Sequence, residues 1–196
     1  MSSRSSAISS TIASGRLAPT RLRQAGLVLI GSLLLAVSAQ ISIPMWPVPL
    51  TLELYAIFLI GAFYGWRLGA VTIAAWLLQG ALGLPVFAHG TGGLASFTGP
   101  TAGYLLSFPL VGALASLAAV RSGQAFRPLR VFTLLWLAGV VCLLAGWAWL
   151  STLMGAKAAW AAGFVPFLLC DAIKAALATA TLAVWHSRKP QRPELR

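Results

Sequence analysis

Long apolar stretches without charge alternate with short basic segments along the chain. No charged residue occurs in 24–52, 68–120 or 131–156. A helix needs about 20 apolar residues, at ~1.5 Å of rise each, to cross the hydrocarbon core of a bilayer. Bounding the apolar runs by charge, Gly and Pro, we predict six membrane-spanning helices, at about 25–43, 50–66, 68–83, 100–120, 131–154 and 164–186.

Composition excludes most other classes of protein. Hydrophobic residues make up 59% of the chain and charged residues 9%, against roughly a quarter charged in soluble domains. A water-soluble globule would need more polar surface, and a disordered chain would be less hydrophobic and more charged. The two Cys residues exclude a disulfide framework and a four-thiolate zinc site. The predicted fold is therefore an all-α integral membrane bundle.

The basic residues predict the orientation of this bundle. An even number of spans places both termini on one side, and twelve of the fourteen Lys and Arg residues then fall on that side. By the positive-inside rule both termini are cytoplasmic. The net charge of +11 thus reflects topology, with anionic membrane lipid as a partner and no nucleic acid. The twelve residues are Arg4, Arg16, Arg21, Arg23, Arg67, Arg121, Arg127, Arg130, Arg188, Lys189, Arg192 and Arg196.

The chain is predicted to form one domain between two tails. We expect a disordered cytoplasmic tail at 1–23, six helices in 24–187 and a basic C-terminal tail at 188–196. A competing interpretation of the N-terminus is a secretory signal peptide cleaved after "VSA" at 37–39. We favour a span, because the basic tail is long and the apolar run continues beyond that sequence to Ile43.

Charged residues inside predicted spans are costly and therefore informative. Asp171 and Lys174 are three residues apart in the sixth span, on one helix face and within mutual reach. They either neutralise each other as a structural pair or meet a polar ligand. We favour the ligand, because apolar packing can replace a purely structural pair at little cost. Glu53, near the outer end of the second span, is a helix-start carboxylate, a water-facing group or a third member of the same site.

Other polar or aromatic residues accompany this charged trio. Gln79 is expected to form an interhelical hydrogen bond at a similar level, and Trp46 lies in the Pro-rich segment 43–49 above the trio. The Gly-rich, largely apolar segment 84–100 is expected to cap or line a cavity. Because His89 has no second His nearby, we expect no metal site.

Catalytic signatures are missing from the sequence. It contains no HExxH, no GxSxG and no GxxxxGK[ST] motif. We therefore predict a protein that is not an enzyme and has no ATPase of its own. Energy for any transport must come from a partner or a gradient.

Three segments together resemble the BioY family, the biotin-binding S components of energy-coupling-factor (ECF) vitamin transporters. They are "IPMWPVPLTLELYAIFLIGAFYGWRLGA" (43–70), "GALGLPVFAHGTGGLASFTGPTAGYLLSF" (80–108) and "VPFLLCDAIKAALA" (165–178). The run "GLPVF" followed by "GPTAGY" is the most specific part. The resemblance extends from about residue 25 to residue 186.

This resemblance implies six helices in the bacterial cytoplasmic membrane and a biotin pocket near the outer face. It implies docking on a transmembrane T subunit driven by a pair of ABC ATPases, although some family members occur without them. No cofactor is implied. The ligand-binding residues it suggests, together with those chosen above, are Asp171, Lys174, Tyr104, Phe87, Glu53, Trp46 and Gln79. The expected loop framework is Gly83, Pro85, Gly99, Pro100, Thr101 and Gly103.

Biotin is chemically compatible with these residues. A carboxylate of Asp171 accepts ureido N–H groups, whereas Lys174 donates either to the ureido carbonyl or to the biotin carboxylate. Glu53 departs from the family pattern, which has Gln there, and adds negative charge near an anionic vitamin. The alternatives are an S component for another vitamin, an integral-membrane enzyme or a structural bundle.

Overall fold

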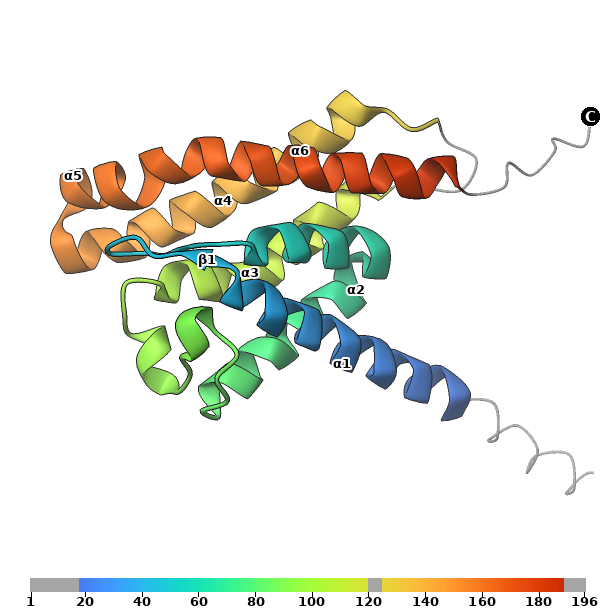
Figure 1. The fold of residues 1–196 in the computed structure, drawn as a ribbon, viewed down its shortest axis with the longest axis horizontal. Helices are drawn as coiled ribbons and strands as arrows, with labels where there is room; N and C mark the ends of the chain where they lie inside the picture. Colours follow the sequence, from blue (N-terminus) through green and yellow to red (C-terminus); the bar gives the residue numbers. More distant parts are fainter. Residues whose placement is uncertain (1–17, 120–124, 189–196) are drawn as a thin grey trace, which may run out of the picture.

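The computed structural model describes residues 18–119 and 125–188. Its main helices are α1 (Ala18–Gln40), α2 (Glu53–Ala81), α3 (Ala102–Ala115), α4 (Pro128–Met154) and α6 (Val165–Ser187). Helices α2, α3, α4 and α6 pack around a common core, and α1 packs against α2 on the outside (Figure 1). The short elements are β1 (Ser42–Ile43), β2 (Leu50–Thr51), η2 (Ala88–Gly90), η3 (Leu94–Phe97), η4 (Ser116–Ala118), α5 (Ala156–Ala159) and η5 (Trp160–Phe164).

Helix α2 consists of two helices that meet at Gly65. The backbone at Gly65 has φ 78° and ψ 174°, a left-handed conformation that side chains disfavour. A Cβ atom on Gly69 would lie 3.4 Å from the Cα atom of Gly61, so the two halves pack directly against each other. The predicted spans 50–66 and 68–83, which leave only one residue between them, agree with this pair of helices.

Every predicted span overlaps a helix in the structure, but several predicted boundaries are wrong. The first span ends at Gln40 and the second begins at Glu53, because Ser42–Ile43 and Leu50–Thr51 pair as strands. Helix α1 begins at Ala18, so residues 18–23 are helical rather than part of a disordered tail. Pro19 explains the early start, because Pro is well suited to the first turn of a helix. The predictions for residues 1–17, for Arg121 and for residues 189–196 lie outside the described residues.

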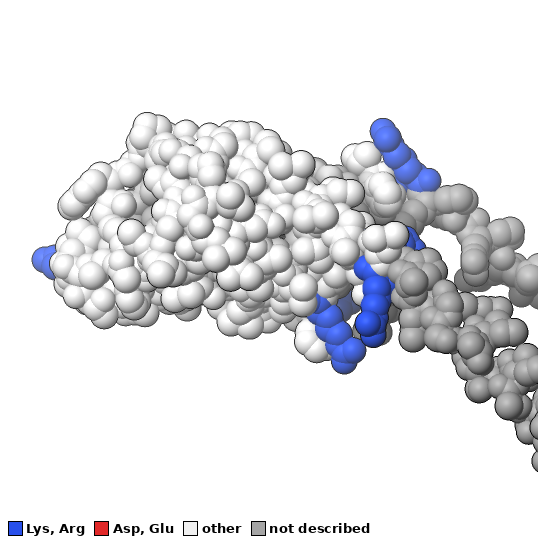
Figure 2. All heavy atoms as spheres, turned by 90° about the horizontal axis from the view of Figure 1, so that it is seen from below, with Lys and Arg blue, Asp and Glu red and all other residues white. Residues whose placement is uncertain are grey.

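The helices have the length and composition of membrane helices. Four segments of the described chain are apolar and long enough to cross a bilayer: Arg21–Gln40, Glu53–Ala81, Pro128–Met154 and Ala156–Ser187. Helix α3 and η4 add a shorter apolar helix, Ala102–Ala118. In Figure 2, Lys and Arg side chains gather mainly at the end of the molecule from which the undescribed residues extend.

Small residues bring the helices into backbone contact. A Cβ atom on Gly61 would collide with the carbonyl oxygen of Gly112, on α3, and would lie 2.8 Å from the Cβ atom of Ala115. A Cβ atom on Gly103 would lie 2.7 Å from the carbonyl oxygen of Ala145, on α4. Within a membrane such close packing supplies much of the helix association energy, because lipid is as apolar as the core.

We predict that Gly61→Ala destabilises the protein and that Gly26→Ala does not. The added methyl group at Gly61 has no room, whereas Gly26, on α1, has no atom within 4 Å of its Cβ position. Overpacking lowers the free energy of unfolding by about 1–3 kcal/mol. Thermal unfolding in detergent measures the difference; equal stability of the two variants would contradict the contact between α2 and α3.

Candidate functional site

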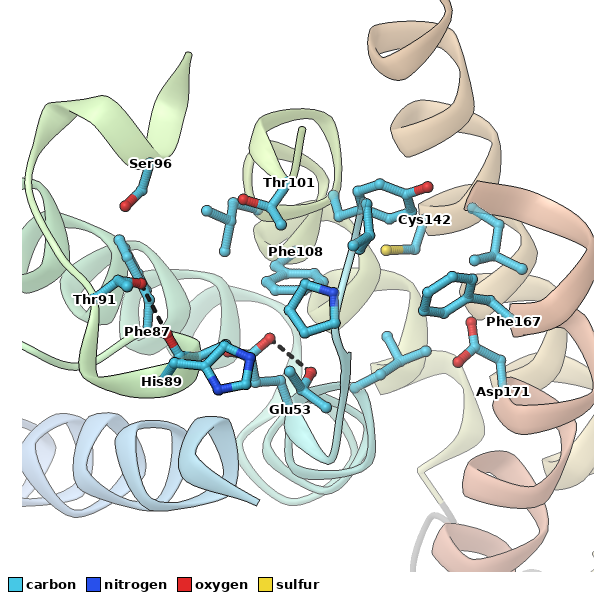
Figure 3. A pocket seen from close by; sticks show the side chains of 18 of the residues that line it. Glu53, Phe87, His89, Thr91, Ser96, Thr101, Phe108, Cys142, Phe167 and Asp171 are labelled. Atoms are coloured by element: carbon cyan, nitrogen blue, oxygen red, sulfur yellow. Dashed lines mark hydrogen bonds between the residues drawn. The ribbon is translucent and has the colours of Figure 1, made fainter. Parts of the chain in front are cut away.

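A cavity of about 220 Å³ lies between α2, α3, α4 and α6. Two connecting segments cover it: the β1–β2 hairpin, through Val48 and Thr51, and the segment 84–100, through Phe87, His89 and Ser96 (Figure 3). The expectation that 84–100 caps or lines a cavity is therefore confirmed. Since a water molecule occupies roughly 30 Å³, the volume suits one small organic molecule.

The ion pair on α6 forms one wall of this cavity. The Nζ atom of Lys174 donates to the Oδ1 atom of Asp171 at 2.9 Å. Asp171 is 3% exposed and Lys174 is 8% exposed. Gly139 of α4 faces this wall, and its Cβ position lies 3.7 Å from the Cβ atom of Asp171, an ordinary van der Waals distance, so α4 packs directly beside the pair. The predicted pair on one helix face is confirmed.

The pair retains unused hydrogen-bonding capacity. Within the described residues the Oδ2 atom of Asp171 accepts no hydrogen bond, and Lys174 makes only the one donation to Asp171. Both residues line the cavity. Because buried charged groups require polar partners, these atoms favour a polar ligand inside the cavity.

A second carboxylate opens onto the same space. Glu53 is the first residue of α2 and is 5% exposed, and the Thr51 hydroxyl donates to its Oε2 atom at 2.9 Å (Figure 3). A carboxylate is favourable in the first turn of a helix, so the interpretation of Glu53 as a helix-start carboxylate also agrees with the structure. The water-facing alternative is wrong, because the side chain is buried. The three charged residues thus converge on one cavity.

Aromatic side chains supply the apolar part of the cavity. Phe87, Tyr104, Phe108 and Phe167 all line it. The ring of Phe87 lies edge-on to Trp76, with 5.0 Å between ring centroids, in the space that a side chain at residue 80 would fill. The Nε1 atom of Trp76 donates to the carbonyl of Val86 at 3.2 Å, and Gln40 donates to the carbonyl of Phe87 at 3.0 Å. These bonds fix the covering segment in place.

Tyr104 joins the cavity to the start of α6. Its hydroxyl donates to the carbonyl of Gly163 at 2.6 Å, inside η5, the turn of π-helix that precedes α6. Its ring fits against Gly146 of α4, where a Cβ atom would collide with it. The phenol ring is therefore a cavity wall, whereas the hydroxyl group braces the helix that carries the ion pair.

Comparison with known proteins identifies the family. Residues 8–191 match the BioY family. The chain belongs to the BioY family. It is 37% identical over 158 residues to the probable biotin transporter BioY of Pyrococcus horikoshii, covering 81% of this chain and 93% of the relative. It is 36% identical over 145 residues to the biotin transporter BioY of Thermotoga maritima, covering 74% and 85% respectively.

A solved structure shares the fold. The crystal structure of the S-component for biotin from an ECF-type ABC transporter superimposes with a TM-score of 0.74, covering 91% of this chain and 98% of the other at 21% identity. BioY proteins are substrate-binding transporter components, so this chain is not an enzyme. Both the family resemblance and the non-enzymatic prediction are confirmed by these matches.

The structure brings most, though not all, of the predicted site residues to the cavity. Asp171, Lys174, Glu53, Phe87 and Tyr104 line it, as does Thr101 of the predicted framework. Trp46, Gln79 and the other predicted framework residues lie outside the lining: Gly83, Pro85, Gly99, Pro100 and Gly103, the last of them within α3.

Two of the predicted ligand contacts have other surroundings. Trp46 is 83% exposed, because pairing of Ser42 with Thr51 and of Ile43 with Leu50 places it at the far end of the hairpin. Gln79 donates to the hydroxyl of Ser32 at 3.2 Å, which confirms the interhelical hydrogen bond predicted for it.

Several cavity residues escaped the sequence analysis. Phe167 had a usable signal, since it precedes Asp171 by four residues and therefore shares its helix face. Cys142, on α4, lines the cavity and accepts a hydrogen bond from Ser107 at 3.3 Å, and no local pattern indicates this. His89 lines the cavity as well. In residues 18–119 and 125–188 no three His, Cys, Asp or Glu residues group into a metal site.

We predict that Tyr104→Phe destabilises the protein even without ligand. The substitution leaves the buried carbonyl of Gly163 without its donor, which costs about 1–3 kcal/mol. Tyr55→Phe is the matched control, because the Tyr55 hydroxyl meets Thr181 at 2.9 Å in a half-buried position, and Thr181 also donates to Leu177. Thermal unfolding in detergent should show a clear loss of stability for Tyr104→Phe and little for Tyr55→Phe. Unchanged stability of Tyr104→Phe would refute the stabilising role of the hydrogen bond to Gly163.

Proposed function

We propose that this protein takes up biotin across the bacterial cytoplasmic membrane by binding it in the cavity described above. The observation that carries the proposal is the buried Asp171–Lys174 pair facing an aromatic-walled cavity in a chain of the BioY family. The relatives from Pyrococcus horikoshii and Thermotoga maritima bear the name of biotin transporters.

The chemistry of biotin supports this assignment. An Asp171 carboxylate oxygen accepts a ureido N–H, and the remaining N–H groups of Lys174 donate to a biotin oxygen. Glu53 offers a second carboxylate in the same cavity. Phe87 and Tyr104 pack on the apolar ring and chain of the vitamin. We do not assign ligand contacts to Trp46 or Gln79.

We further propose six spans with both termini in the cytoplasm. The two halves of α2 count separately because of the turn at Gly65. Ala102–Ala118 spans about 25 Å at ~1.5 Å per residue, close to the hydrocarbon thickness of roughly 30 Å. The basic end of the bundle (Figure 2) then faces the cytoplasm, and the cavity opens toward the outer side.

Inward delivery needs a source of energy, and we propose an ECF T subunit with a pair of ABC ATPases. The sequence carries no ATP-binding motif. The structural relative belongs to an ECF-type ABC transporter, which supports this kind of coupling.

Biotin titration of the wild type tests the proposed substrate, and titration of the ion-pair variants tests the proposed site. We expect saturable quenching or enhancement of tryptophan fluorescence by biotin, and none by riboflavin or thiamine, for the purified full chain in detergent. Asp171→Asn and Lys174→Ala should each weaken binding by about tenfold or more, since each removes a charge-assisted bond. Lys157→Ala, in the link between α4 and α6 and outside the cavity, should bind like the wild type.

Two results would contradict parts of this proposal. Wild-type affinity in both folded ion-pair variants would place the biotin site elsewhere. A response to another vitamin, without one to biotin, would keep the fold and discard the substrate.

Uptake measurements test the proposed energy source. In cells without another biotin transporter, co-expression with an ECF T subunit and its ATPases should raise the initial rate of radiolabelled biotin uptake several-fold. An ATPase variant that cannot hydrolyse ATP is the control and should abolish the increase. Equal uptake by the chain alone would show a solitary mode.

A further inference from the structure

A large groove runs along the basic end of the bundle, apart from the proposed biotin cavity. It has a volume of about 1310 Å³ and is lined mainly by α1, by α2 on both sides of Gly65 and by α6. Arg23 from α1 and Arg188 at the end of α6 line this groove. Apolar side chains such as Phe63, Leu177 and Trp185 form its walls. Residues far apart in the sequence thus build one surface.

The charges of the groove select an anion. No acidic residue lies among the described residues that line it, and the carboxylates of Glu53 and Asp171 are both buried. Figure 2 shows no acidic side chain on the face it presents. Guanidinium groups bind phosphate through paired hydrogen bonds. Arg23 and Arg188 therefore each suit a phosphate group at the groove.

The walls below these arginines are apolar and have the depth of one membrane leaflet. Leu177 and Arg188 are eleven positions apart on α6, which is about 16 Å at ~1.5 Å per residue. Half of a hydrocarbon core is also about 15 Å. The ring of Phe63 lies edge-on to Trp185, with 5.4 Å between centroids, and Trp185 is 55% exposed. Tryptophan at this level is typical of a lipid interface.

We propose that the groove binds one anionic phospholipid. Its phosphate binds Arg188 at the end of α6, and one acyl chain follows the apolar wall of the same helix from Trp185 to Leu177. Arg23 of α1 adds a second positive charge to the same groove. The leaflet-length wall favours a lipid over a soluble anion, and the two positive charges without an acidic neighbour in the lining favour an anionic lipid over a zwitterionic one.

Native mass spectrometry of the full chain in detergent tests this site. With phosphatidylglycerol and phosphatidylcholine at equal concentration, we expect phosphatidylglycerol to be retained in roughly tenfold preference. The double variant Arg23→Gln, Arg188→Gln should lose that preference. Arg127→Gln, Arg130→Gln is the matched control, since these two arginines line a different groove, and it should keep the preference.

A second measurement does not depend on the arginine variants. Phosphatidylglycerol brominated on its acyl chain should quench the fluorescence of Trp185, so Trp185→Phe should remove more of the quenching than Trp66→Phe. Trp66 lines the other groove.

Three outcomes would overturn the proposal. The first is equal retention of the two lipids by the wild type. The second is an equal loss of the phosphatidylglycerol preference in both double variants. The third is displacement of the lipid by glycerol phosphate, which has no acyl chain. Capture of a membrane protein in place of lipid would likewise assign the groove to a protein partner.

Discussion

Lys174 and Asp171 meet at 2.9 Å inside a helix bundle, where an isolated charge would be very costly. The surroundings reflect that constraint. Helix α4 packs beside the pair at Gly139, Tyr104 braces the turn before α6, and the covering segment closes over the cavity. Since the pair satisfies only part of its own hydrogen-bonding capacity, the bundle encloses a polar space that a ligand completes.

Sequence reasoning succeeded where the signal is local. Gaps between charges located the helices, the adjacent predicted spans 50–66 and 68–83 matched the two halves of α2, and the spacing of Asp171 and Lys174 placed them on one face. It failed where position depends on the packing of distant segments. Trp46 lies outside the cavity lining and is exposed because strand pairing places it at the end of the hairpin, and Cys142 reaches the cavity from another helix.

Glycine determines how closely these elements approach one another. The covering segment lies over the cavity because the ring of Phe87 fits into the space left by Gly80, beside Trp76. Helices α2 and α3 touch through Gly61 and its neighbours for the same reason. Such contacts depend on complementary shapes in three dimensions, so an apolar run in the sequence predicts a helix but not its partner.

The turn at Gly65 has a mechanical consequence. Because a single residue reverses the chain, and Gly61 and Gly69 lie in contact beside it, the two halves of α2 have no connecting loop that could lengthen or swing. We therefore expect the two halves to move together. Opening of the cavity would then involve longer connections, such as the hairpin before Glu53 and the chain between α2 and α3.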